Sequence, residues 1–250
     1  MTLPAPDKPV VQGAAPAGAP DRQAAARAVR EMFTAIAPRY DLLNHVFSMN
    51  VDRLWWRRAA RTFTHILRRP DARVLDLCCG TADMALALRR QGAASIFGAD
   101  FSHAMLTLAS RKVRDRVKLI EADALALPVG DACFDLVVSA FGFRNLTDYD
   151  AGLREILRVL RQGGEVGILD FGEPRGVLGK IYRVYFRRVL PVVGTVISGV
   201  RGPYAYLPAS VERFPDPSQM LERMRAAGFA DVSWTPYTFG IAGLYRGRKP

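Results

Sequence analysis

Short apolar runs alternate with segments of helical periodicity through the middle of the chain. The expected buried strands are Arg73–Leu77, Ser95–Asp100, Val117–Glu121, Phe134–Ala140 and Glu165–Asp170. Between them, apolar residues three and four positions apart predict helices at Met84–Arg90, Ser102–Lys112 (capped by Ser102) and Asp150–Arg161 (capped by Asp150). Strands that alternate with helices indicate an α/β protein with a doubly wound parallel sheet.

The flanking segments carry three more helical patterns and two strand patterns. Asp21 and Asp52 can cap the first two helices, and the third has Pro217 in its first turn and Gly228 as its stop. These elements are helices at Asp21–Ala37, Asp52–Leu67 and Asp216–Ala227, and short strands near Ala230–Trp234 and Gly240–Tyr245. The two strands are expected to close the sheet as an antiparallel hairpin.

The domain organisation follows from these elements. Residues 1–20 are rich in Pro, Ala and Gly and are predicted to be a disordered tail rather than a signal peptide. One domain is expected over 21–250. Its parts are a helical segment at 21–70, a ligand-binding core at 71–171, an inserted helical cap at 172–210, and a final helix with strands at 211–250. No apolar run reaches the length of a membrane-spanning helix.

Charge and cysteine content limit the possible binding partners and the cellular compartment. The net charge is +11, most of the positive charge is on arginine, and basic residues cluster within 53–69 and within 175–188. Such groups are most often solvated surface, although nucleic acid and anionic membranes are the other partners of a basic protein. The three cysteines, Cys78, Cys79 and Cys133, have no disulfide or zinc spacing, which is typical of a reduced, cytoplasmic protein.

The segment Asp76–Asp83, with the sequence DLCCGTAD, is the strongest indication of a ligand site. Its small residues, including Gly80 and Thr81, let the backbone bend between a strand and a helix and approach a ligand. Asp100 ends the next strand, where a carboxylate can accept hydrogen bonds from both ribose hydroxyls. The pattern lacks G-x-G-x-x-G, which disfavours NAD, and its D-x-x-x-G-T form fits S-adenosylmethionine better.

The ends of the next two strands add candidate ligand contacts. Asp123 can accept from an adenine amino group, and the Ala124 N–H can face a ring nitrogen. The fourth strand ends at Ala140, and Phe141 and Phe143 follow it. An N-P-P-[YF] motif of nucleic-acid base methylation is absent there, and the aromatic residues favour an apolar, aromatic substrate.

Several motifs in order along the chain resemble one known family. They are Tyr40–Asn44, Asp76–Asp83, Phe141–Asn145, Arg158–Arg161 with Gly163 and Gly164, and Tyr206–Leu207. Over roughly Arg30 to Lys249 the chain resembles the ubiquinone/menaquinone biosynthesis C-methyltransferases (UbiE/MenG type). The resemblance implies a Rossmann-like class I fold that methylates a polyprenyl quinol ring with S-adenosylmethionine and without a metal.

The resemblance also supports assignments to individual residues. Cofactor contacts are expected from the strand ends, at Asp76, Gly80, Thr81, Asp100, Asp123, Ala124 and Ala140. Ala140 stands where the family often has Ser, so only a backbone contact is expected there. Because a phenol has a pKa of about 10, the site must favour the phenolate. Arg144 is the expected oxyanion stabiliser, Asn145 the group that orients the hydroxyl or a water, and Tyr40, Phe141 and Phe143 the walls around the ring.

Substrate and partners are predicted less narrowly. Demethylmenaquinol is favoured because the Ala- and Arg-rich composition is typical of bacteria, and a benzoquinol of ubiquinone biosynthesis remains open. The competing classes are an RNA methyltransferase, an NAD-dependent oxidoreductase and a cofactor-binding protein without catalysis. No nucleic-acid partner is expected. Three alternatives remain for the 177–200 region: a lid over the prenyl tail, a peripheral contact with the inner face of the membrane, or simple packing of a cap helix on the domain. Homo-oligomerisation is also left open.

Overall fold

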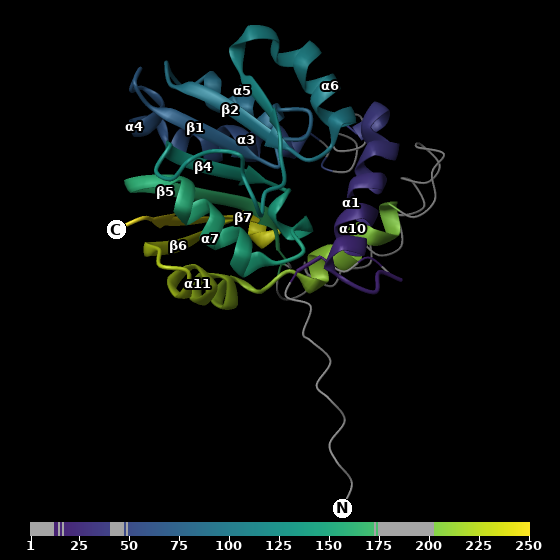
Figure 1. Ribbon diagram of the computed structural model, residues 1–250. Coiled ribbons are helices and arrows are strands. Elements are labelled where there is room, and N and C mark those ends of the chain that lie inside the picture. The colour runs from purple at the N-terminus through teal and green to yellow at the C-terminus, as the bar shows by residue number, and fades with distance from the viewer. Residues whose placement is uncertain are drawn as a thin grey trace, which may run out of the picture.

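The computed structural model describes residues 13, 14, 16, 18–40, 48, 50–172, 174 and 203–250. The described residues build a single seven-stranded sheet in the order β3-β2-β1-β4-β5-β7-β6, with helices on both faces (Figure 1). The strands are β1 (Arg73–Leu77), β2 (Ser95–Asp100), β3 (Lys118–Glu121), β4 (Phe134–Ala140), β5 (Leu160–Phe171), β6 (Ala230–Tyr237) and β7 (Ala242–Arg248).

Strands β1 to β5 are parallel, and β7 runs antiparallel to both of its neighbours, β5 and β6. The first three strands occupy one half of the sheet, and β4 then pairs with the other side of β1. This reversal of strand order is the switch point at which doubly wound sheets bind ligands. The predicted α/β doubly wound fold is therefore confirmed.

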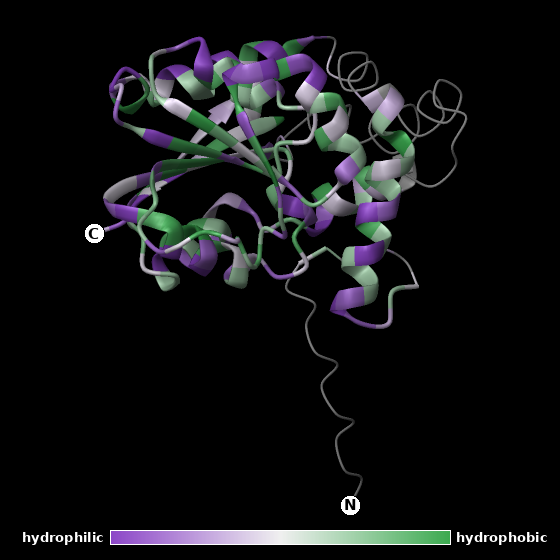
Figure 2. Ribbon diagram, turned by 45° about the horizontal axis from the view of Figure 1, so that its top comes forward, coloured by the Kyte–Doolittle hydropathy of each residue, from purple (hydrophilic) through white to green (hydrophobic). Residues whose placement is uncertain are grey.

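Two helical layers enclose the sheet. The helices are α1 (Arg22–Ile36), α3 (Val51–Thr62), α4 (Thr64–Leu67), α5 (Asp83–Arg89), α6 (His103–Val113), α7 (Tyr149–Val159), α10 (Pro203–Arg213) and α11 (Pro217–Ala226). Side chains of α3, α4, α5 and α6 form one apolar core with the sheet, and those of α7 and α11 form a second core on the opposite face. Figure 2 shows hydrophobic residues concentrated along the strands between these layers.

The carboxyl ends of the parallel strands meet at one edge of the sheet. Figure 1 shows α1 and α10 beyond that edge, away from the layers that cover the two faces. A short 3-10 turn, η1 (Ala37–Arg39), extends α1 to Tyr40. Segments from both ends of the chain therefore lie over the edge where ligands are expected.

Two of the predicted helix caps are confirmed and two are wrong. Asp21 accepts from the Ala24 N–H at 2.7 Å, and Ser102 accepts from the Met105 N–H at 3.4 Å. Asp216, which was not predicted as a cap, forms a complete capping box at the start of α11. Asp148 rather than Asp150 caps α7, because its side chain accepts from the Ala151 N–H at 2.9 Å. Asp52 lies inside the first turn of α3, where it is buried and accepts from the N–H of the next residue.

Strand β5 is longer than predicted. The strand begins at Leu160, directly after α7, so the helix expected to reach Arg161 ends at Val159. Gly163 adopts a left-handed φ of 75° within this strand. Because helical and strand residues follow each other without a loop, the apolar pattern alone could not separate the two elements.

The inserted cap predicted for 172–210 is described only in part. Gly172, Pro174 and helix α10 belong to the described residues, while 173 and 175–202 lie outside them. The second group of basic residues and the predicted 177–200 lid or membrane contact therefore also lie outside the described part, as do most of residues 1–20. Among the helices that are described, none is both long and apolar enough to cross a bilayer.

Candidate functional site

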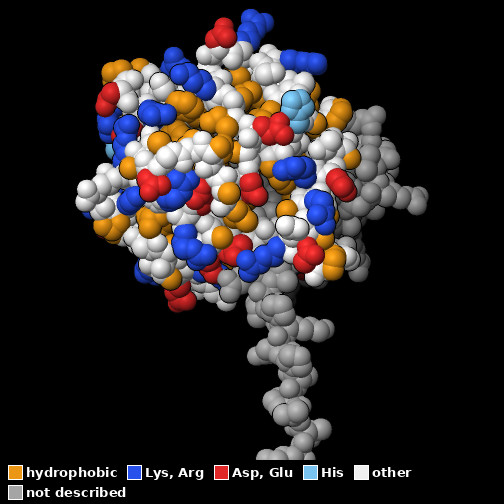
Figure 3. Space-filling model, in the orientation of Figure 1, with side chains coloured by type: hydrophobic (Ala, Val, Ile, Leu, Met, Phe, Trp, Pro, Cys, Tyr) orange, Lys and Arg blue, Asp and Glu red, His pale blue; other side chains and the backbone are white. Residues whose placement is uncertain are grey.

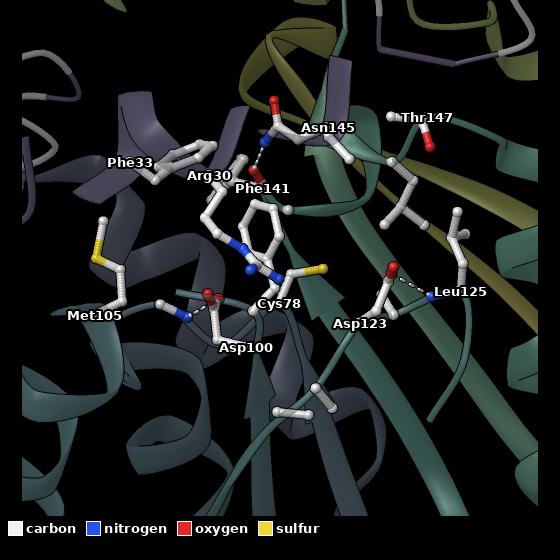
Figure 4. Close-up of a pocket in the computed structure, with 18 of the residues that line it drawn as sticks. Arg30, Phe33, Cys78, Asp100, Met105, Asp123, Leu125, Phe141, Asn145 and Thr147 are labelled. Carbon is white, nitrogen blue, oxygen red and sulfur yellow. Dashed lines mark hydrogen bonds between the residues drawn. The ribbon is translucent and has the colours of Figure 1, made fainter. Parts of the chain in front are cut away.

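A cavity of about 260 Å³ lies between the carboxyl edge of the sheet and α1. Four successive strand ends contribute to its wall, together with one face of the amino-terminal helix. The residues that line it are Gln23, Ala26, Arg27, Arg30, Phe33, Tyr40, Cys78, Gly80, Ala99, Asp100, Phe101, Met105, Ala122, Asp123, Ala124, Leu125, Ala140, Phe141, Gly142, Asn145, Leu146 and Thr147. Figure 4 shows that the labelled side chains converge from these separate elements.

The loop after β1 has an unusual backbone. Cys78, Gly80 and Ala82 have left-handed φ angles of 57°, 52° and 67°. Left-handed conformations are unfavourable for residues with a Cβ, and such positions cluster at ligand sites. Gly142 approaches this loop so closely that a Cβ there would lie 2.4 Å from Cβ of Cys78. The loops after β1 and β4 therefore form one continuous wall.

Asp100 is held by the loop that it faces. Its Oδ2 accepts from the Gly80 N–H and its Oδ1 from the Ser102 N–H, both at 2.9 Å. Burial raises the pKa of the Asp100 carboxyl above its ordinary value, although these donors and the charge of Arg30 favour the ionised form. Each carboxylate oxygen keeps lone pairs for further donors, as a ribose with two hydroxyls requires.

The next strand end provides a second acceptor. Asp123 Oδ1 accepts from the Leu125 N–H at 2.9 Å, which fixes the carboxylate at the cavity wall. Ala124 is buried beside it. Both residues line the cavity next to Asp100, and their contact with an adenine ring stays a prediction.

Helix α1 covers the cavity, a role that the sequence analysis did not assign. The face with Gln23, Ala26, Arg27, Arg30 and Phe33 lines the cavity at helical spacing. Arg30 extends into it toward Asp100 and Cys78 (Figure 4), and its Cζ lies 5.2 Å from the centre of the Phe101 ring. The pattern of basic, small and aromatic residues on one helical face was the available signal.

Two polar contacts attach α1 to the rest of the site. Arg22 Nη1 lies 2.7 Å from Asp148 Oδ2, and the hydroxyls of Thr34 and Ser102 are 3.2 Å apart. The first contact joins the start of the helix to the cap of α7, and the second joins its last turns to the cap of α6. Both ends of the cover are therefore tied to loops that also form the cavity.

A buried ion pair shapes the turn after β4. Arg144 Nη1 donates to Asp170 Oδ1 at 2.9 Å, and the Arg144 backbone N–H donates to Asp170 Oδ2 at 3.1 Å. The same guanidinium also donates to the carbonyl of Phe141. Asp170 is fully buried at the end of β5. One carboxylate thus holds both the backbone and the side chain of this turn.

The turn presents Phe141 and Asn145 to the cavity. Phe141 has a left-handed φ of 59°, and its ring lies 4.5 Å from that of Phe171. Asn145 Oδ1 accepts from the hydroxyl of Tyr206 at 3.2 Å. Burial raises the pKa of Tyr206, so its hydroxyl remains a donor at neutral pH. The sequence places Tyr206 in a family motif but predicts no contact for it. The fold shows that α10 brings its hydroxyl to Asn145.

Four residues predicted for the site do not line the cavity. Arg144 is turned into the interior, where only 7% of its side chain is exposed, so it does not face a bound ring. Its ion-pair partner is Asp170. Phe143 is fully buried and stacks on Tyr149 in the core.

The other two lie beneath the loop after β1. Asp76 is completely buried, and that burial raises its pKa well above the ordinary aspartate value. The Thr81 hydroxyl lies 3.4 Å from Asp83 Oδ2 at the start of α5. Both residues shape the loop, whereas the predicted positions Tyr40, Gly80, Asp100, Asp123, Ala124, Ala140, Phe141 and Asn145 reach the cavity itself.

The site shows no metal-binding arrangement. No cluster of three or more His, Cys, Asp or Glu side chains suited to a metal occurs among the residues that the structure describes. The described cysteines are free, and burial raises the pKa of Cys78 and Cys79 well above the ordinary thiol value. The thiol of Cys78 therefore lines the cavity in its neutral form.

The fold agrees with solved structures of one class. The chain superposes on a SAM-dependent methyltransferase from Aquifex aeolicus with a TM-score of 0.55 at 16% identity, covering 77% of this chain and 89% of that one. The [4+2]-cyclase SpnF gives a TM-score of 0.67 at 20% identity, covering 95% and 98%. At such identities the likeness concerns the fold, which is that of the class I S-adenosylmethionine-dependent methyltransferases.

Sequence comparison defines the family. Residues 21–249 match the ubiE/COQ5 methyltransferase family. A demethylmenaquinone methyltransferase of Thermus thermophilus is 49% identical over 88% of this chain and 100% of its own length. One from Deinococcus radiodurans is 47% identical over 92% and 95%. The chain belongs to the ubiE/COQ5 family and is an S-adenosylmethionine-dependent methyltransferase, as the sequence motifs predicted.

The buried ion pair leads to a stability prediction. Arg144→Ala leaves the Asp170 carboxylate buried without a counter-charge, and loss of one partner of such a pair typically costs about 3–5 kcal/mol. We expect a large fall in the free energy of unfolding, measured by urea denaturation. Arg22→Ala removes the exposed ion pair to Asp148 and is the control, with an expected loss of at most about 1 kcal/mol. An Arg144→Ala protein of native stability would show that the pair does not hold the turn.

The environment of Asp100 leads to a pH prediction. The acceptor form of a carboxylate exists above its pKa, and burial raises that of Asp100 above the ordinary 3.8. Cofactor affinity, measured by calorimetry, should therefore fall on acidification before the pH reaches that of an ordinary aspartate. Asp100→Asn should weaken binding by about tenfold or more at neutral pH and remove this pH dependence. Glu121→Gln, at the neighbouring strand end, should behave as wild type, and native affinity in Asp100→Asn would exclude Asp100 as the ribose acceptor.

Proposed function

We propose that this methyltransferase acts on a ring carbon of a polyprenyl quinol and converts demethylmenaquinol to menaquinol. One structural observation carries the proposal. An aromatic wall made by Phe33, Tyr40 and Phe141 stands beside a hydrogen-bonding amide, Asn145, at the same cavity as the carboxylate Asp100. The names of the relatives at 49% and 47% identity, both demethylmenaquinone methyltransferases, agree with this choice of ring.

The described residues fit S-adenosylmethionine at the strand ends. Asp100 is placed for the ribose, and Asp123 with Ala124 for the adenine. Gly80 leaves open space toward the cavity, since a Cβ there would meet only the Tyr40 ring, at 3.8 Å. When bound, the cofactor supplies an electrophilic methyl group on a sulfonium. Its methionyl part would extend along the loop after β1 toward Ala140 and Phe141.

The chain's own residues prepare the acceptor ring. A quinol carbon becomes nucleophilic when a neighbouring hydroxyl is ionised or strongly polarised. The Asn145 amide N–H₂ can donate to that oxygen, and Tyr206 fixes the amide by donating to its other end. Arg144 does not contact the ring but positions Asn145, because its pairing with Asp170 holds the backbone of the turn.

The aromatic wall sets the ring in place and limits the access of water. Phe33 and Tyr40 meet edge to face with ring centres 6.1 Å apart. Phe141 closes the opposite side of the cavity and packs on Phe171 behind it. Such a surface favours a planar apolar ring, and holding that ring against the methyl donor lowers the entropic part of the barrier.

Methyl transfer from labelled S-adenosylmethionine tests the proposed function. We expect label to enter reduced demethylmenaquinone, with a short prenyl chain to keep it dispersed, when the purified protein is present. A demethylated benzoquinol is the parallel substrate, because a relative from Geobacter sulfurreducens at 44% identity carries the broader name ubiquinone/menaquinone biosynthesis C-methyltransferase. Label in the benzoquinol alone would contradict the choice of ring, and label in neither, with cofactor bound, would contradict the quinol substrate.

The Tyr206–Asn145 contact leads to a kinetic prediction. Tyr206→Phe removes the hydroxyl that orients the amide, and a single neutral hydrogen bond contributes about 0.5–1.5 kcal/mol. We expect kcat to fall about two- to tenfold, while cofactor affinity stays at the wild-type value. Tyr245→Phe deletes another buried hydroxyl, away from the cavity, and is the matched control. Equal kcat in Tyr206→Phe and wild type would remove the contact from the mechanism.

A further inference from the structure

Helix α3 carries an exposed stripe that the cavity does not use. Leu54, Arg57, Arg58 and Arg61 are spaced three and four residues apart, so they share one face of the helix, and all four are exposed. The opposite face, with Trp55 and Ala59, is buried in the core. The side chain of Leu54 is 58% exposed, which makes it one of only two large hydrophobic residues so exposed in the described part of the chain.

The second such residue is Phe239, which is 82% exposed. It lies in η5 (Thr238–Gly240), the turn between β6 and β7. Thr238, Phe239 and Gly240 have consecutive left-handed φ angles of 45°, 58° and 89°. A left-handed conformation costs a residue with a Cβ about 1–2 kcal/mol, and an aromatic ring in water gains no burial to offset it. The fold thus holds a large apolar side chain outward by means of a strained turn.

The two exposed side chains belong to one surface. Trp55 Nε1 donates to Thr238 Oγ1 at 2.8 Å. Leu54 precedes Trp55 and Phe239 follows Thr238 in the sequence, so this hydrogen bond brings their two backbone segments together. Strand β7 starts opposite Phe171, at the carboxyl end of β5. The turn therefore lies at the same edge of the sheet as the cavity.

A row of aromatic rings connects this surface to the cavity. The Trp55 ring lies 5.8 Å from that of Phe141 and 6.2 Å from that of Phe171. Phe141 is itself part of the cavity wall. Trp55 is buried and the three rings pack in one apolar core, so the row joins α3 to the cavity wall.

The arginines of the stripe are available to an anionic partner. No acidic side chain forms an ion pair with Arg57, Arg58 or Arg61 within the described ranges. Arg58 lies over the Tyr237 ring, with Cζ 4.3 Å from the ring centre. By contrast, Arg69 and Arg246 nearby are paired with carboxylates. On the face drawn in Figure 3, basic and acidic side chains are interspersed. A row of arginines without acidic partners therefore differs from the charge distribution on that face.

We propose that Leu54, Arg57, Arg58, Arg61 and Phe239, here called the docking face, bind the surface of an anionic phospholipid bilayer. The two apolar side chains would enter the acyl boundary, and the guanidinium groups would meet the headgroup phosphates. A bilayer fits better than a nucleic acid because protruding aliphatic and aromatic side chains flank the arginines. The proposal rests on the proposed function in one respect, since a bilayer on this face would hold a prenylated quinol at the same edge of the sheet as the cavity.

Vesicle flotation with the full chain tests the docking face. The vesicles are pure phosphatidylcholine, or phosphatidylcholine with a third of phosphatidylglycerol, at low and at physiological salt. We expect binding to the anionic vesicles and little to the neutral ones. Leu54→Ser with Phe239→Ser, and separately Arg57→Glu with Arg61→Glu, should each lower the partition coefficient by about tenfold or more.

The matched control changes the same charge elsewhere. Arg154 on α7 and Arg225 on α11 are exposed on the opposite side of the sheet, and Arg154→Glu with Arg225→Glu should leave vesicle binding nearly unchanged. Equal loss in the control and in Arg57→Glu/Arg61→Glu would show a diffuse charge effect and overturn the proposal. Vesicle binding at the wild-type level in both docking-face variants would overturn the proposal as well. So would a wild-type protein that binds RNA but does not bind the anionic vesicles.

An activity readout separates this proposal from the proposed function. The docking-face variants should methylate a short-chain quinol in detergent at the wild-type rate, and should lose about tenfold with a long-chain quinol embedded in anionic vesicles. If no variant methylates either quinol while vesicle binding still depends on the docking face, the substrate is wrong and the surface stands. If the long-chain rate is unaffected by the variants, the role of the docking face in substrate delivery is excluded.

Discussion

The site depends on one buried carboxylate. Asp170, at the end of β5, binds the backbone N–H and the guanidinium of Arg144, and the same guanidinium binds the Phe141 carbonyl. Such a pair is stable in the interior only if its geometry is satisfied on both sides, so it leaves the turn few alternatives. Phe141 and Asn145 face the cavity as a consequence. The ion pair thus fixes the turn after β4 in the conformation that lines the cavity.

The cavity divides into two chemically different parts. Carboxylates at the ends of β2 and β3 suit a nucleoside, and the aromatic residues of the amino-terminal segment and of the turn after β4 suit a planar apolar ring. Helix α1 spans both parts, with Arg30 near Asp100 and Phe33 near Tyr40. Enclosure from this side excludes water from a reaction in which a charged methyl donor meets a phenolate. The same edge of the sheet carries the exposed Phe239.

Sequence periodicity predicted the sheet well because parallel strands are buried on both faces and read as apolar runs between helices. The strand ends also located Asp100, Asp123 and Ala140, since topology alone brings such positions to one edge. Side-chain direction was less predictable. Arg144 and Phe143 belong to a motif that resembles the family, yet they point into the core, because one turn of 3-10 helix directs neighbouring residues to opposite sides. The cover by α1 depends on contacts between distant segments, such as Arg22 with Asp148, which no local pattern encodes.

A crystal structure with S-adenosylhomocysteine and a short-chain naphthoquinol analogue would test the central claim most directly. The account predicts that the ribose hydroxyls bind Asp100, that the adenine lies against Asp123 and Ala124, and that the ring lies on Phe141 with an oxygen at the Asn145 amide. Helix α1 should cover the cofactor, and the Arg144–Asp170 pair should be intact. A cofactor bound outside this cavity, or a ring held directly by the Arg144 guanidinium after its release from Asp170, would contradict it.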